Sequence, residues 1–261
     1  MTDTWAVGDE YEPYIGRWSR RVAHDFVTWL GVPAQQRWLD VGCGTGALTE
    51  AIVELADPAS VIAVEPSEGF LAFARRRVTD PRVRFAQGDA RALPVDDASC
   101  DACVSGLVLN FVPDVARAVG ELRRAARPGG VVATYLWDYA GEMQLIRRFW
   151  DAAIALDPAA ADLDEGQRFP ICEPAALSAL FASEGLTGVE VRAIDVPTVF
   201  RDFDDYWQPF LGAQGPAPGY AMALPDDRRA ALRERLRATL PTAADGRIEL
   251  RARAWAVRSV A

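Results

Sequence analysis

Apolar and polar positions alternate in blocks along the first half of the chain. Short, nearly continuous apolar runs predict strands at residues 38–41, 61–65, 83–86, 102–107 and 131–136. Between them, stretches with helical periodicity lie at residues 47–55, 68–78 and 115–126. Strands that are apolar along their whole length are expected where helices cover both faces of a sheet. The alternation therefore predicts an α/β fold with a doubly wound, mostly parallel sheet.

The alternation loosens beyond residue 136. Helices are predicted there at residues 142–156, 174–183 and 226–240, and strands at residues 189–200 and 247–260. A further helix is predicted at residues 18–30, before the first strand. The two late strands are separated by an insertion, so we expect an antiparallel edge on the parallel sheet. The R-P-G-G run at residues 127–130 predicts the end of a helix before the fifth strand.

Composition narrows the class of protein. The formal net charge is −9 and no basic run exceeds three residues, which argues against a nucleic-acid partner. The chain has no lysine, which excludes a Schiff-base lysine, a Walker lysine and the lysine of a Tyr-Lys dehydrogenase pair. The apolar runs are too short to span a bilayer, and the acidic N-terminus does not resemble a signal peptide. We expect a cytoplasmic enzyme without membrane insertion, either a monomer or a homodimer.

Cysteine spacing predicts no metal site. Cys100 and Cys103 form one C-x-x-C, but no second pair and no nearby histidine completes a set of zinc ligands. In a regular strand, positions three apart point to opposite faces of the sheet. We therefore expect reduced, structural cysteines.

A glycine loop follows the first predicted strand. The segment R-W-L-D-V-G-C-G-T-G-A-L-T-E places Gly42, Gly44 and Gly46 between this strand and a helix. Glycine permits backbone conformations that a β-carbon disfavours, and it leaves room for a ligand on the main chain. The amides at the start of the following helix can face that ligand. This is the pattern of a nucleotide-type cofactor site, and it also satisfies the dinucleotide motif G-x-G-x-x-G/A.

Carboxylates after successive strands separate two candidate cofactors. Glu65 closes the second strand and can accept hydrogen bonds from both ribose hydroxyls, a role that serves NAD and S-adenosylmethionine equally. Asp40 lies two residues before the first glycine, where a carboxylate would repel a pyrophosphate but suits the amino end of a methionine moiety. Asp89 follows the third strand in G-D-A and can accept the adenine amino group. Together these residues favour S-adenosylmethionine.

Residues 37–137 resemble the class I S-adenosylmethionine-dependent methyltransferases, especially small-molecule enzymes such as those that methylate quinone precursors. The resemblance implies a Rossmann-like sheet of order 3-2-1-4-5-7-6 with the last strand antiparallel. It implies cofactor contacts from the glycine loop, the strand ends and the N-terminal segment, at Tyr11, Arg17, Asp40, Gly42, Cys43, Gly44, Gly46, Glu65, Pro66, Ser67, Asp89, Ala90, Ser105, Gly106 and Leu107.

The same resemblance suggests how the chain is divided. We expect one methyltransferase domain over residues 1–261, with a cofactor-binding core at residues 36–137. Segments that cover the substrate are expected at residues 1–35, 138–168 and 201–245. Residues 170–200 and 246–261 are expected to complete the sheet.

Aromatic residues gather in the predicted covering segments. They favour a planar or apolar small molecule as the methyl acceptor, although they could equally join the cap to the core. The predicted acceptor-binding residues are Tyr14, Trp18, Trp137, Tyr139, Trp150 and Trp207. Transfer from a sulfonium needs a general base only if the acceptor must lose a proton, and no catalytic triad is present. His24, which lies off the apolar stripe of its helix, and Asp138, which could instead cap a turn, are the candidates for that base.

Two other functions stay open. An NAD-linked oxidoreductase is permitted by the glycine loop, and a protein that binds S-adenosylmethionine without transferring methyl could use the same fold. Nucleic-acid methylation is disfavoured, because Asn110-Phe111-Val112-Pro113 stands where amino-methylating enzymes carry N/D-P-P-Y/F. The sequence thus predicts transfer of a methyl group to an O, N or C atom of a small molecule by in-line displacement.

Overall fold

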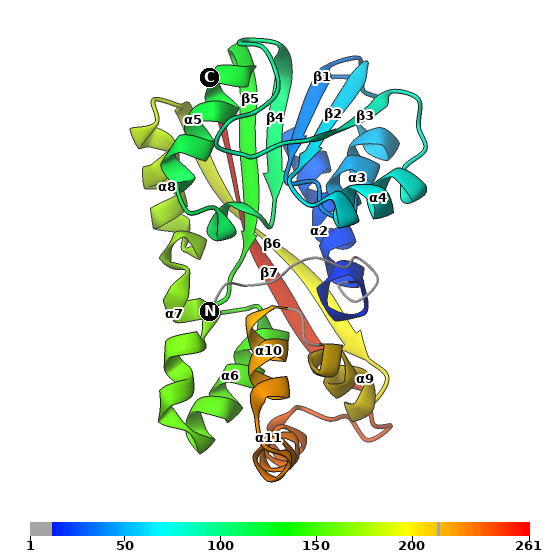
Figure 1. Cartoon of the computed structure of the whole chain (residues 1–261), viewed down its shortest axis with the longest axis vertical. Coiled ribbons are helices and arrows are strands. Elements are labelled where there is room, and N and C mark those ends of the chain that lie inside the picture. Colours follow the sequence, from blue (N-terminus) through cyan, green and yellow to red (C-terminus); the bar gives the residue numbers. More distant parts are fainter. Residues whose placement is uncertain (1–11, 213–214) are drawn as a thin grey trace. The chain divides into compact units, whose positions relative to one another are not determined.

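A single sheet runs through the part of the chain that the computed structural model describes, residues 12–212 and 215–261. Within these residues its strand order is β3-β2-β1-β4-β5-β7-β6 (Figure 1). The strands are β1 Arg37–Val41, β2 Ser60–Glu65, β3 Val83–Gln87, β4 Cys100–Gly106, β5 Ala126–Trp137, β6 Thr187–Phe200 and β7 Ile248–Val260. The pairs β1–β2, β1–β4, β2–β3 and β4–β5 are parallel.

The last strand runs antiparallel to β5. Ala261 N donates to Gly130 O at 3.0 Å, and Asp138 N donates to Arg253 O at 2.9 Å. Residue numbers therefore rise along one strand as they fall along the other. The predicted strand order and the antiparallel last strand are both confirmed.

Helices connect the strands. In and around the first five strands they are η1 Glu12–Gly16, α2 Arg17–Leu30, α3 Ala47–Leu55, α4 Glu68–Arg77, η2 Leu109–Phe111 and α5 Val115–Ala125. Later helices are α6 Gln144–Leu156, η3 Pro158–Leu163, α7 Glu165–Arg168, η4 Pro170–Cys172, α8 Pro174–Ser183, α9 Phe203–Trp207, η5 Gln208–Gly212, α10 Pro216–Ala223 and α11 Asp226–Thr239. Side-chain caps begin several of them; Ser67, for example, accepts from Phe70 N before α4, and Asp114 accepts from Arg117 N before α5.

Residue contacts divide the chain into two compact units. Unit 1 comprises Met1–Trp18, Trp137–Pro170 and Asp195–Arg253. Unit 2 comprises Ser19–Leu136, Ile171–Ile194 and Ala254–Ala261. In unit 2, α3 and α4 pack against β2, and α5 packs against β4. Figure 1 shows α3 and α4 on one side of these strands and α5 on the other, as a doubly wound sheet requires.

The helix before the R-P-G-G run ends as predicted, but the run itself lies within the fifth strand and not before it. Helix α5 already ends at Ala125, and β5 begins at Ala126 and runs through both glycines. The reason is pairing with the end of the chain, since Gly129 N donates to Ala261 O at 3.0 Å. Gly129 has a φ of 76°, which glycine adopts without strain.

The C-x-x-C pair also differs from expectation. The register between β4 and β5 shifts between Cys100 and Ala102, so the strand is not regular across the motif. The two thiols consequently lie within hydrogen-bonding reach of each other, and this contact is the main cause that lowers the pKa of Cys100 to about 7. Both cysteines are buried and unoxidised, as expected of structural thiols.

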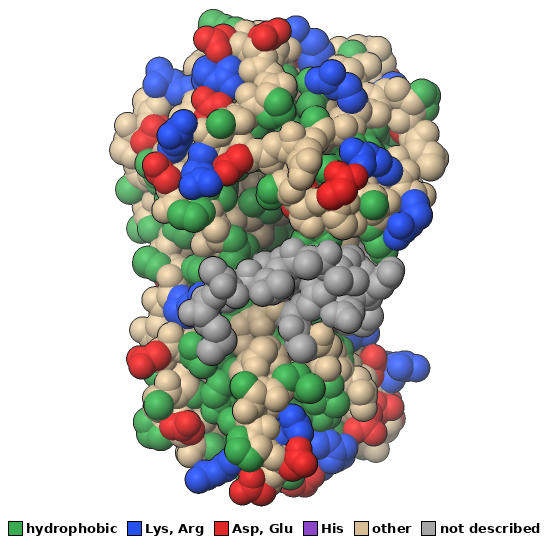
Figure 2. Space-filling model, viewed as in Figure 1, with side chains coloured by type: hydrophobic (Ala, Val, Ile, Leu, Met, Phe, Trp, Pro, Cys, Tyr) green, Lys and Arg blue, Asp and Glu red, His purple; other side chains and the backbone are tan. Residues whose placement is uncertain are grey.

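Charged side chains of both signs are interspersed on the molecular face in Figure 2. Every basic side chain drawn there is arginine, because the chain has no lysine. Among the helices of the described residues, none has the length and apolar character needed to cross a membrane.

Candidate functional site

The sheet order reverses direction between β1 and β4. From β1 the chain proceeds outward to β2 and β3, then returns to form β4 on the other side of β1. In such sheets, ligands bind outside the carboxyl ends of the strands at this switch point. The segments that leave β1 and β4 in unit 2 are therefore the first place to seek a site.

The glycine loop leaves β1 and is held by the neighbouring strand. Gly42 N and Cys43 N both donate to Val64 O, at 2.7 and 3.1 Å. Gly42 has a φ of 74°, and a Cβ there would lie 2.5 Å from the Val108 side chain. A Cβ on Gly44, whose φ is 52°, would meet nothing within 4 Å. The loop is thus packed on one side and open at Gly44, where a ligand can approach the backbone.

Cys43 turns away from this open space. Its side chain is buried in a cluster with Ala63 and Leu71, and burial raises the pKa of its thiol. Gly46, with a φ of 88°, ends the loop and precedes α3. The Cys43 side chain therefore has a packing role.

Asp40 is a carboxyl group in the interior of unit 2. Thr49 Oγ1 donates to Asp40 Oδ2 at 2.6 Å, whereas Oδ1 is buried and has no hydrogen-bond partner in the described chain. Burial raises the pKa of Asp40 to about 7, and the nearby Glu65 carboxylate adds to the increase. A buried acceptor without a donor is destabilising, so Oδ1 fits a cationic donor such as the ammonium of a methionine moiety.

Glu65 links the glycine loop to the start of α4. Its two carboxylate oxygens accept from Gly44 N at 3.2 Å and from Ser67 N at 3.0 Å. Burial raises its pKa. Asp40 pairs with Ala63, two residues before Glu65, so both carboxylates lie on one face of the sheet.

The residues predicted to flank the ribose lie after β2, and those predicted to frame the adenine lie after β3. Asp89 forms a two-point ion pair with Arg91, whose Nη2 lies 2.6 Å from Oδ2, and this contact lowers the pKa of Asp89 to about 2. Ala90 is buried. Ser67 caps α4, and Pro66 O accepts from the Gln87 side chain at 3.0 Å. Asp89 is thus a permanent carboxylate at neutral pH.

The three residues predicted to contact the cofactor at the end of β4 differ in their surroundings. Ser105 is fully buried, but it neighbours Val104, which pairs with Asp40, so its side chain lies on the opposite face of the sheet. A Cβ on Gly106 would lie 2.5 Å from the Tyr135 hydroxyl. Leu107 adopts a φ of 62°, which is unusual for a residue with a side chain. The cofactor contacts predicted for these residues remain predictions.

Two predicted cofactor contacts come from the N-terminal segment. Tyr11 lies outside the described residues. Arg17, in unit 1, donates from Nη1 to Asp205 at 3.3 Å and stacks on the rings of Trp18 and Phe200. Its Nε and Nη2 are buried without a hydrogen-bond partner in the described chain. These donors suit an anion, so the prediction that Arg17 binds a carboxylate stays a prediction.

All predicted acceptor-binding aromatics are buried in unit 1, at most 4% exposed: Tyr14, Trp18, Trp137, Tyr139, Trp150 and Trp207. Several join one aromatic cluster around Phe210, which contacts Tyr14 and Trp207 and stacks on Phe149 at 4.6 Å between ring centroids. Trp150 packs edge-on against Phe149 and donates its indole N–H to the buried Glu165 carboxyl. The geometry brings these side chains together as a core, and their contact with an acceptor remains a prediction.

The two base candidates already have partners. His24 is exposed and lies 3.1 Å from Glu54, on the surface of unit 2. Asp138 is buried in unit 1, and its Oδ2 accepts from Glu142 N at 2.9 Å, which closes a turn. The turn-capping alternative for Asp138 thus matches its hydrogen bonding.

Sequence reasoning did not name Thr49, Val108 or Asn110 as site residues. Thr49 could have been found from its place in the first turn of the helix that follows the glycine loop. Val108 and Asn110 directly follow β4 at the switch point, and the Asn110 Nδ2 is buried without a partner among the described residues. Val108 and Asn110 could be recognised as site residues only once the fold was known.

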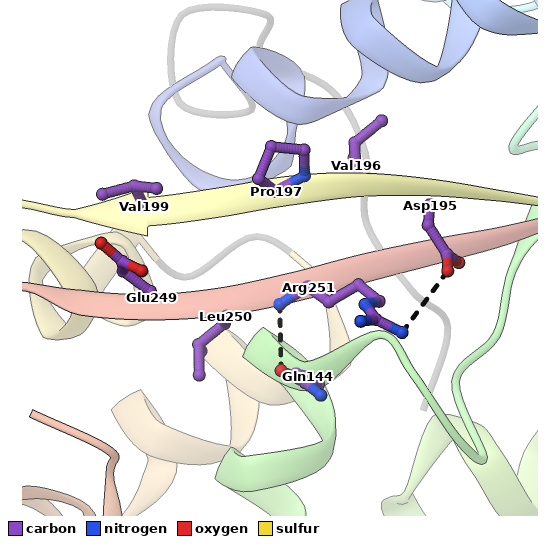
Figure 3. A pocket seen from close by; sticks show the side chains of 8 residues that line it. All are labelled: Gln144, Asp195, Val196, Pro197, Val199, Glu249, Leu250 and Arg251. Atoms are coloured by element: carbon purple, nitrogen blue, oxygen red, sulfur yellow. Dashed lines mark hydrogen bonds and ion pairs between the residues drawn. The ribbon is translucent and has the colours of Figure 1, made fainter.

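A separate pocket of about 420 Å³ lies within unit 1 (Figure 3). Its lining comes from β6, β7 and the first residue of α6: Gln144, Asp195, Val196, Pro197, Val199, Glu249, Leu250 and Arg251. Arg251 spans it, donating from its backbone N to Gln144 Oε1 at 2.9 Å and pairing with Asp195 at 3.5 Å. None of the residues predicted to bind cofactor or acceptor lines this pocket.

Comparisons with known proteins agree with this geometry. Residues 39–134 match the family model described as a methyltransferase domain. A demethylmenaquinone methyltransferase from Clavibacter sepedonicus is 37% identical over 119 residues, which is 45% of this chain and 47% of that protein. The chain thus spans about half the length of the curated relatives it matches.

Solved structures match over most of the chain. A putative methyltransferase from Bacillus halodurans aligns with a TM-score of 0.61 at 14% identity, covering 91% of this chain and 97% of that one. A Haemonchus contortus phosphoethanolamine N-methyltransferase in complex with S-adenosylhomocysteine aligns with a TM-score of 0.62 at 17% identity, covering 97% and 56%. At these identities the likeness shows the fold alone.

Proposed function

We propose that this chain, which belongs to the class I S-adenosylmethionine-dependent methyltransferases, transfers a methyl group from S-adenosylmethionine to an O, N or C atom of a small aromatic or apolar molecule. The observation that carries the proposal is the buried, unpartnered Oδ1 of Asp40 beside an open glycine loop. A pyrophosphate cofactor would be repelled at this position, whereas an ammonium group would satisfy it.

In unit 2, three carboxylates are proposed to bind three different parts of the cofactor. Asp40 holds the amino end of the cofactor, Glu65 accepts from the ribose hydroxyls, and Asp89 accepts from the adenine amino group. When bound, the sulfonium supplies an activated methyl group and its own leaving group. The chain's remaining tasks are to align the acceptor in line with the carbon–sulfur bond and to exclude water.

Two observations support the proposed class of acceptor. The predicted acceptor-binding segments are rich in aromatic side chains, which favours planar or apolar molecules. The Clavibacter relative is a demethylmenaquinone methyltransferase, so a quinol or a related phenol is the first acceptor to test.

A ligand panel tests the cofactor. Thermal unfolding is measured with S-adenosylhomocysteine and with NADH, each at about a hundred times its dissociation constant where it binds. Binding should add about 2.7 kcal/mol to the stability for S-adenosylhomocysteine. Stabilisation by NADH alone would instead favour an oxidoreductase. Turnover of S-adenosylmethionine with quinols, phenols, carboxylic acids and amines then separates a transferase from a protein that only binds the cofactor.

The variant Glu65→Ala tests the proposed contact between Glu65 and the ribose hydroxyls. We expect at least a tenfold loss of affinity for S-adenosylhomocysteine in titration calorimetry, because both ribose hydrogen bonds disappear. Glu68→Ala, a change to an exposed carboxylate three residues further on, serves as the control and should bind like the wild type. Unchanged affinity in Glu65→Ala would mean that the ribose contact is misassigned.

A further inference from the structure

The chain leaves β4 through a strained turn. Leu107 adopts a φ of 62°, and its N donates to Tyr135 O at 2.8 Å. The turn continues as η2, in which Phe111 N donates to Val108 O at 2.8 Å. A non-glycine residue in this conformation is unfavourable by about 1 kcal/mol or more, and such strain gathers at ligand sites.

This turn packs directly against the glycine loop. The Val108 side chain occupies the space where a Cβ on Gly42 would lie, at 2.5 Å. The two segments leave adjacent strands at the switch point of the sheet. Whatever binds on the glycine loop of unit 2 is therefore bordered by the turn that carries Asn110.

Asn110 is the only asparagine of the chain. Its Nδ2 is buried and makes no hydrogen bond to any part of the chain that the structure describes. Leaving a buried donor unpaired destabilises a protein by about 1–3 kcal/mol, and native structures seldom retain one without a reason. Leu109, its neighbour, is fully buried and anchors the turn.

We propose that Asn110 donates a hydrogen bond from Nδ2 to an uncharged oxygen of the methyl acceptor. The inference rests on the proposed function, and it narrows the acceptor to molecules with a hydroxyl or carbonyl group. An anionic oxygen buried here would need a paired positive charge, which a neutral amide does not supply, so the amide suits a hydroxyl or carbonyl oxygen. The amino, ribose and adenine groups of the cofactor have other proposed partners in Asp40, Glu65 and Asp89. Asn110 is accordingly a positioning residue that orients the acceptor.

The test compares two probes that differ by one hydroxyl group. The dissociation constants of 2-naphthol and naphthalene are measured by ligand-observed NMR on protein saturated with S-adenosylhomocysteine. Wild-type protein should bind 2-naphthol at least fivefold more tightly than naphthalene, the effect of one buried hydrogen bond. In Asn110→Ala, which removes the side-chain amide, this ratio should fall below twofold.

Two controls separate the possible failures. Gln36→Ala removes an exposed amide before β1 and should keep the wild-type ratio. Affinity for S-adenosylhomocysteine, measured separately by calorimetry, should be unchanged in Asn110→Ala, which also shows that the variant folds.

Each contrary result has a defined meaning. A ratio that is insensitive to Asn110, or a wild-type protein that binds the probes equally or not at all, overturns this inference and leaves the cofactor assignment intact. A tenfold loss of S-adenosylhomocysteine affinity in Asn110→Ala also overturns it, since the amide would then contact the cofactor. Failure of the wild type to bind S-adenosylhomocysteine overturns the proposed function itself.

Discussion

Asp40 is poised between its two protonation states at neutral pH. Burial raises its pKa to about 7, Thr49 opposes the shift by donating a hydrogen bond, and Glu65 reinforces it. Because the folded pKa lies above the unfolded value of about 3.9, Asp40 favours the folded state below pH 4. This contribution to stability is lost as the pH rises through 7, where an unpaired carboxylate becomes buried.

The same titration predicts pH-dependent cofactor binding. An ammonium group pairs with the ionised form of Asp40, so binding must release the proton that the free protein holds below pH 7. We expect the affinity for S-adenosylhomocysteine to rise with pH from 5.5 to about 7, by up to tenfold per unit, and then to level off. Titration calorimetry in buffers of different ionisation enthalpy measures both the affinity and the protons released.

A ligand and a variant serve as controls for this prediction. 5′-Methylthioadenosine has no amino acid portion, so its affinity should not follow the titration of Asp40. Asp40→Asn should bind S-adenosylhomocysteine more weakly and with little pH dependence. A wild-type affinity that stays constant between pH 5.5 and 8 would contradict the assignment of Asp40.

At the scale of secondary structure, the hydrophobic pattern predicted the positions of those helices and strands that are determined by their own residues. The helix at residues 47–55 and the strands that follow it lie close to their predicted positions, because apolar runs and glycine punctuation are local signals. The R-P-G-G run was correctly predicted to end a helix, but the start of β5 was placed too late, because both glycines pair with Ala261, a partner that is distant in sequence. The unpaired Asn110 amide was missed for the same reason, since its surroundings exist only in the folded protein.

Asp101 ties three strands together at their other end. Its carboxylate accepts from Arg37 N at 2.8 Å and Arg37 Nε at 3.0 Å, and it also accepts from Arg127 Nε. These hydrogen bonds hold the pKa of Asp101 well below its usual range. We expect Asp101→Ala to lower the free energy of unfolding by about 2–3 kcal/mol at pH 7, measured by urea denaturation.

The pH dependence of this effect has the opposite sign to that of Asp40. A lowered folded pKa stabilises the protein above about pH 3.9, and the contribution is lost as the pH falls through the folded pKa. The stability difference between wild type and Asp101→Ala should therefore narrow by about 1 kcal/mol from pH 5 to pH 3. Asp97→Ala, at a highly exposed ion pair with Arg124, should change stability by less than about 0.5 kcal/mol. Equal effects of the two variants would mean that Asp101 forms an ordinary surface pair.

For the molecule as a whole, the sequence indicated the sheet order through its resemblance to a family, but composition could not say what the aromatic residues do. An aromatic-rich segment is compatible with an acceptor pocket and with a packed core. In unit 1 the rings contact one another around Phe210, and side-chain contact of this kind cannot be inferred from the spacing of residues in an irregular segment.

Phe210 offers a test of whether unit 1 is stabilised by its own core. The ring is fully buried and contacts Tyr14, Phe149, Tyr206 and Trp207. Phe210→Ala should lower stability by about 3–5 kcal/mol, because it leaves a cavity at the centre of the cluster. Since those contacts lie within unit 1, amide exchange should accelerate mainly in α6 and much less in β2 of unit 2. Leu156→Ala, at an exposed apolar position in the same unit, should leave both rates nearly unchanged. Equal acceleration in α6 and β2 would instead mean that the aromatic cluster stabilises the chain as one cooperative unit. The acceptor-binding role of its members would then have to be tested in variants that keep the ring volume.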